Sequence, residues 1–145
     1  MAGDLKALIR YHKWRLDEKR RALADLHSLA ERLREQLAAL EAEIKAEQDA
    51  ARQSTEAALT FANYIAQANF RKKTLASSIA QVDRQIDVAT DEMSEVFQEV
   101  KRYEIAQEER NRREKEKIRQ RETAMFDEVA ASGFQRRQRE SGAGS

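Results

Sequence analysis

The stretch that decides the fold runs from Leu5 to Ile44 and reads LKALIRYHKWRLDEKRRALADLHSLAERLREQLAALEAEI. Taken in alternating steps of four and three residues, it places an apolar residue at almost every step. The positions of this frame are Leu5, Ile9, His12, Leu16, Lys19, Leu23, Leu26, Ala30, Leu33, Leu37, Leu40 and Ile44. An apolar repeat of about 3.5 residues keeps one seam of a helix facing a partner helix, so the pattern predicts a left-handed coiled coil.

The same frame continues through an apolar-poor stretch between Ile44 and Phe61 and then recovers. The second stripe, which passes over Lys72, consists of Phe61, Ile65, Ala68, Leu75, Ile79, Val82, Ile86, Ala89, Met93, Val96, Val100 and Tyr103. Folding the chain at about Ser54 sets Leu5 opposite Tyr103, which favours an antiparallel hairpin of two matched helices. The phase of the frame alone also allows one straight helix in a parallel dimer.

The composition agrees with a helical class and excludes several others. The chain has 145 residues, 37% of them charged, with no proline, no cysteine and no glycine between Gly3 and Gly133. The scarcity of the turn-forming residues proline and glycine excludes a β-sandwich, a Rossmann-like sheet and a glycine-rich phosphate loop. Without cysteine there is no disulfide framework or thiolate zinc site. The mean hydropathy is −0.84 and no apolar run reaches about 18 residues, so we expect a soluble protein without a membrane span.

The expected architecture is all-α, a long antiparallel two-helix coiled-coil hairpin with an extended charged C-terminal helix. We predict a first helix over about 4–51, a turn over about 52–57 and a second helix over about 58–131, forming a single hairpin over 1–132. Gly133 predicts the helix end, and residues 133–145 read as a disordered tail.

Charge is divided along the chain. Residues 1–21 carry a net charge of +4, residues 22–100 carry −6 and residues 101–145 carry +3. In a hairpin both termini lie at one end, so a basic end and an acidic body would attract different partners.

No catalytic or metal-binding constellation is present in the sequence. His12 lies on the seam, where a polar residue such as histidine usually sets the register of the two helices. His27 is fifteen residues away, so the two histidines form no motif. We therefore expect no enzyme activity, no cofactor and no metal. Glutamates interleave with the basic run 110–121 and would repel phosphate, which favours a solvated helix over nucleic-acid binding.

Four aromatic residues fall off the seam and are candidates for partner contact: Tyr11 and Trp14 on the first helix, and Tyr64 and Phe70 near the turn. Large apolar side chains exposed on a thin helical protein are typical of binding surfaces. Local packing at a frayed helix end is the alternative. A further apolar group follows at helical spacing in the C-terminal helix: Ile118, Met125, Phe126 and Val129.

Three segments carry a resemblance to a known family. They are LKALIRYHKWRLDEKRR at 5–21, the region from Phe61 through Tyr64 to Ile79, and KRYE at 101–104 with the charged helix after it. Over residues 1–139 the chain resembles FliJ proteins, the small coiled-coil component of the flagellar type III export apparatus.

The resemblance implies a non-enzymatic protein, expected to be a monomer, that is cytoplasmic and peripheral at the cytoplasmic face of the inner membrane at the flagellar base. The end with both termini would enter the hexameric export ATPase and promote its assembly and hydrolysis, while another part would contact the cytoplasmic domain of the export-gate membrane protein. Escort of export chaperones is also attributed to the family. Against the ATPase ring we expect Tyr11, Trp14, Arg110, Arg112, Arg113, Ile118, Met125 and Phe126. Against the gate we expect Tyr64, Phe70, Gln67 and Arg71. The alternative function is a dimeric coiled-coil scaffold or adaptor with no ATPase partner.

Overall fold

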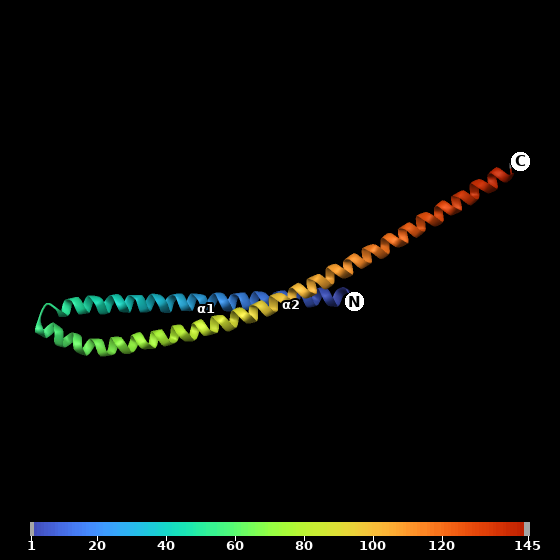
Figure 1. Ribbon diagram of the computed structural model, residues 1–145. Coiled ribbons are helices and arrows are strands. Elements are labelled where there is room, and N and C mark those ends of the chain that lie inside the picture. Colours follow the sequence, from blue (N-terminus) through green and yellow to red (C-terminus); the bar gives the residue numbers. More distant parts are fainter. Residues whose placement is uncertain (1, 144–145) are drawn as a thin grey trace. The chain divides into compact units, whose positions relative to one another are not determined.

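The protein consists of two helices joined by a short turn. The computed structural model describes residues 2–143 and contains α1 (Ala2–Ala51) and α2 (Thr55–Ala143), with no strand among those residues (Figure 1). The two helices pack against each other, which confirms the all-α helical hairpin.

The turn between the helices is shorter than the predicted 52–57. The amide of Gln53 donates to the carbonyl of Ala50 at 3.1 Å, and α2 begins at Thr55. Ser54 caps α2, because its hydroxyl oxygen accepts a hydrogen bond from the amide of Ala57 at 3.1 Å. The cap satisfies the amide of Ala57, which has no partner within the helix, so α2 begins three residues before the predicted start at 58.

The C-terminal end of α2 also differs from the prediction of a helix end at 131. The helix continues through Gly133 to Ala143, so the predicted disordered tail is helical over 133–143, and residues 144–145 lie outside the described part. Glycine within a helix costs only about 1 kcal/mol relative to alanine. It ends a helix when it adopts a left-handed conformation, and no described glycine has positive φ.

The described residues divide into two compact units where a single hairpin over 1–132 was predicted. The hairpin unit is Tyr11–Glu99, and the terminal unit comprises the described residues up to Arg10 together with those from Val100 onward. In the terminal unit every side chain from Arg110 to Ser132 is exposed. This stretch is a solvated helix, as the charged sequence predicted.

The core of the hairpin unit is the predicted seam. Its most buried apolar side chains are Leu16, Ala30, Leu40, Ala68, Val82 and Val96. All six belong to the frame read from the sequence, whereas Lys72, which interrupts its apolar pattern, is exposed. Each helix therefore buries one stripe, and that stripe is buried against the other helix.

Ion pairs between the helices define their direction. Lys19 Nζ lies 2.9 Å from Glu92 Oε2, Arg34 Nη2 lies 2.7 Å from Asp83 Oδ1, and Lys72 Nζ lies 3.8 Å from Glu41 Oε1. The residue number on α1 rises from 19 to 41 as its partner on α2 falls from 92 to 72, so the pairing is antiparallel. Exposed pairs contribute only about 0–1 kcal/mol each, so they specify orientation more than they stabilise the fold.

We predict that Leu40→Ala lowers the free energy of unfolding by about 2 kcal/mol or more, because it removes a side chain that is 3% exposed and leaves a cavity. Leu59→Ala is the matched control, because Leu59 is 67% exposed and also lies in the hairpin unit. Urea denaturation followed by circular dichroism measures both. Equal effects of the two substitutions would contradict the seam assignment.

Candidate partner-binding surfaces

A polar cluster occupies one position of the seam. His12 is 8% exposed, and its Nδ1 lies 3.2 Å from Oε2 of Glu99 on α2. Arg15 donates from Nη1 to the same carboxylate oxygen at 3.4 Å. A buried polar group in a coiled-coil seam favours the one register in which it finds its partner. The cluster therefore agrees with the interpretation of His12 as a residue that sets register.

The aromatic pair at the start of the hairpin unit lies on the surface. Tyr11 and Trp14 are both exposed, and their rings stack with centroids 6.3 Å apart and an interplanar angle of 28°. Tyr11 also meets His12 edge to face, with centroids 5.3 Å apart. Stacking shields part of each ring, and 53% of Tyr11 and 59% of Trp14 remain exposed to solvent.

The other residues expected at the ATPase ring belong to the terminal unit. Ile118, Met125 and Phe126 are exposed. Arg112 Nη2 lies 2.6 Å from Glu109 Oε2, and Arg113 Nε lies 3.9 Å from the other oxygen of the same carboxylate.

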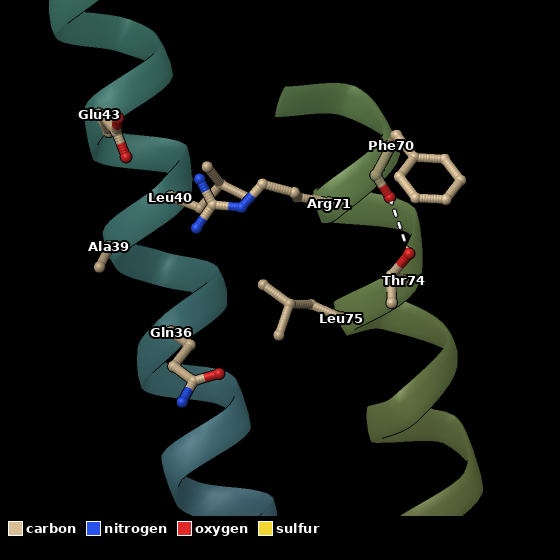
Figure 2. A pocket seen from close by; sticks show the side chains of 8 residues that line it. All are labelled: Gln36, Ala39, Leu40, Glu43, Phe70, Arg71, Thr74 and Leu75. Atoms are coloured by element: carbon tan, nitrogen blue, oxygen red, sulfur yellow. Dashed lines mark hydrogen bonds between the residues drawn. The ribbon is translucent and has the colours of Figure 1, made fainter. Parts of the chain in front are cut away.

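A groove of about 490 Å³ lies between α1 and α2 near the turn (Figure 2). Figure 2 shows Leu40, Arg71 and Leu75 extending into the space between the two helices, while the ring of Phe70 projects away from α1. The hydroxyl of Thr74 donates to the carbonyl of Phe70 at 3.0 Å. The full lining is Gln36, Ala39, Leu40, Glu43, Phe70, Arg71, Thr74 and Leu75.

Two of the four residues expected at the export gate line this groove, namely Phe70 and Arg71. Gln67 is exposed but does not line it. The sequence did not identify the lining residues on α1, because they meet Phe70 and Arg71 only once the register of the two helices is known. The apolar repeat identifies Leu40 and Leu75 as seam residues, but it does not predict that they line a groove.

Tyr64 corrects the prediction of an exposed aromatic residue. It is half-buried, its hydroxyl oxygen is buried, and its ring packs on Phe61 with centroids 6.3 Å apart. Burial raises the pKa of the Tyr64 phenol above its ordinary value of 10.0, and the carboxylates of Glu43 and Glu47 raise it further, whereas Arg71 lowers it. The reason is position: Tyr64 directly precedes the seam residue Ile65, so its long side chain reaches across the edge of the seam toward α1.

Comparison with known proteins decides the family. The family described as flagellar FliJ protein matches residues 1–139 of this chain. The chain belongs to the FliJ family. No match was found among curated proteins or among solved structures.

Membership of the FliJ family makes this chain a coiled-coil protein related to flagellar export. Within residues 2–143, neither helix has a segment long and apolar enough to cross a membrane. The described part of this FliJ family member also contains no group of three or more histidine, aspartate or glutamate residues arranged to hold a metal ion. Its candidate sites are the aromatic pair, the exposed part of α2 and the groove.

We predict that Tyr64 ionises above pH 10, because burial and the neighbouring carboxylates disfavour the phenolate. In a Tyr11→Phe, Tyr103→Phe background, absorbance of the phenolate reports Tyr64 alone. Glu43→Gln should lower the pKa, and Glu47→Gln should lower it less. The folded-state pKa is raised, so the stability that Tyr64 contributes is complete below pH 10 and is lost as pH rises through the raised value. Ionisation at or below pH 10 would contradict the buried position of the hydroxyl.

Proposed function

We propose that this FliJ family member is a stalk-like component of the flagellar type III export apparatus. It binds the hexameric export ATPase, promotes assembly and activity of the ring, and contacts the cytoplasmic domain of the export gate. It acts through contact and not through catalysis, as a monomer in the cytoplasm at the membrane face of the flagellar base. Export chaperones are a further class of partner.

The observation that carries the proposal is the exposed stretch of α2 from Arg110 to Ser132. It is helical and solvated, yet it holds large apolar side chains that are 52–74% exposed: Ile118, Met125, Phe126 and Val129. Exposed apolar side chains on an otherwise charged helix favour contact with a partner. Because the chain belongs to the FliJ family, we propose the export ATPase as the partner of this surface.

The charge of the two units supports a division of labour. The terminal unit carries 14 basic and 10 acidic residues, and the hairpin unit carries 13 basic and 16 acidic residues. Their net charges are therefore +4 and −3. Surfaces of opposite net charge attract different partners, which supports separate partners for the two units.

The groove supports the gate contact. Phe70 is 72% exposed beside a depression whose apolar floor includes Leu40 and Leu75, and Arg71 and Glu43 supply polar groups of both signs. An exposed aromatic ring next to a groove is typical of an anchor residue in a protein interface.

We predict that reversing charge at Arg110, Arg112 and Arg113 to glutamate weakens binding to the export ATPase about tenfold, which is equivalent to roughly 1.4 kcal/mol, and so lowers stimulation of the ATPase. Binding to the gate domain should not change, since the groove lies in the other unit. Glu109→Gln is a control that releases Arg112 and Arg113 from their shared carboxylate without reversing charge. Equal loss of both activities would refute the division of labour. No stimulation by the unmodified protein would favour the scaffold alternative.

We predict that Phe70→Ala weakens binding to the gate domain about tenfold or more, because it removes the exposed ring beside the groove. Leu59→Ala is the matched control, since both residues are large, apolar and exposed on α2 of the hairpin unit but Leu59 does not line the groove. Isothermal titration calorimetry with the purified gate domain measures both. Comparable weakening by the two substitutions would exclude the groove as the contact.

A further inference from the structure

One face of the exposed helix carries an apolar stripe. Ile118, Met125 and Val129 are spaced by seven and then four residues, so they lie on a single face, and Phe126 flanks them. All four side chains are exposed. This spacing is that of the seam in the hairpin unit, where each such stripe is buried against another helix.

Charge changes sign across the stripe. Residues 115–121 contain four basic residues and one acidic residue, whereas residues 126–132 contain two acidic residues and no basic one. Several of these charges form no ion pair within the described part of the chain: Lys115, Lys117, Arg121, Asp127 and Glu128. The segment therefore has a positive half and a negative half, both with charges available to a partner.

A second copy of the same segment complements this pattern when it runs in the opposite direction. Placing Ile118 opposite Val129 of the other copy also sets Met125 opposite Glu122. The positive half of each helix then faces the negative half of the other, and Arg121 lies beside Glu128 of the second copy on both sides of the contact. A parallel pairing would instead place Glu122 against Glu122 and like-charged halves against each other.

We propose that residues 115–132 form an antiparallel helix pair with a second copy of this chain. The contact covers Ile118, Met125 and Phe126, which the proposed function assigns to the ATPase, so under that function only the monomer would bind the ATPase. The inference goes beyond the proposed function and does not depend on it, because self-association is measured on the purified chain alone. Such a short helix pair buries little area, so the dimer is weak and depends on concentration.

The first test is the mass of the full chain by sedimentation equilibrium over a range of protein and salt concentrations. The average mass should rise from 16.7 kDa toward twice that value with increasing protein, and it should rise less at high salt because the charges are exposed. Met125→Glu should stay at the mass of one chain. Ile105→Glu is the matched control, since Ile105 and Met125 are 62% and 66% exposed in the same unit but Ile105 lies off the stripe.

Circular dichroism checks that both variants keep the helical content of the wild type. A wild type that remains one chain at the highest concentration it reaches in solution would overturn the proposal. So would a Met125→Glu variant that associates as strongly as the Ile105→Glu variant.

A charge exchange tests the direction of the pair. Arg121→Glu and Glu128→Arg should each weaken the dimer several-fold, and the double variant should restore it. Residues 121 and 128 are two helical turns apart, about 10 Å along the axis, so they do not pair within one helix. Rescue therefore reports contact between copies, and additive loss in the double variant would overturn the antiparallel register.

A distance measurement gives an independent answer. The chain has no cysteine, so Ala131→Cys provides a single site for a spin label. In the proposed register residue 131 lies level with residue 116 of the second copy, which separates the two labels by about 22 Å along the helix axis. In a parallel pair the two labels would lie level with each other along the helix axis, and the short distance between them would overturn the proposal.

Discussion

Burial of one apolar stripe between α1 and α2 is the interaction on which the hairpin unit depends. Two helices provide a single interface, so a seam residue such as Leu16 or Leu40 has only the opposite helix to pack against. No other layer adds contacts if the register shifts. Polar groups that meet a partner in only one register would then favour that register, as His12 does if it pairs with Glu99, whose Oε2 lies 3.2 Å from the buried Nδ1 of His12 on the other helix.

A single interface also determines where partners can bind. Because most side chains off the seam reach solvent, an apolar side chain there gains nothing from folding and favours association instead. Phe70 and Trp14 are such residues. The groove beside Phe70 is lined by both kinds of residue. Seam residues form its floor, and residues that lie off the seam and stay exposed form its rim.

The sequence predicted what depends on periodicity and missed what depends on distance in space. The 3.5-residue repeat identified every buried apolar side chain of the hairpin unit, because burial in two helices follows helical phase. Phase did not distinguish a hairpin from a straight dimer, which ion pairs such as Arg34 with Asp83 decided. For a related reason, phase does not predict the burial of the Tyr64 hydroxyl: Tyr64 is one residue off the frame, and its burial depends on how the two helices pack. Gly133 was read as a helix end although glycine permits a stop without requiring one.

The exposed part of α2 poses a different energetic problem from the hairpin. Pairs such as Arg112 with Glu109 and Arg119 with Glu116 stabilise a helix by only a few tenths of a kcal/mol each, and isolated helices are marginal in water. Apolar residues at the spacing of Ile118 and Met125 contribute nothing to this solvated helix, yet they would stabilise it once another helix or a ring covers them. Partner binding would then stabilise this helix as well as cover its apolar side chains. Charges of both signs flank the stripe, and they would select which partner surface can bind there and in which orientation.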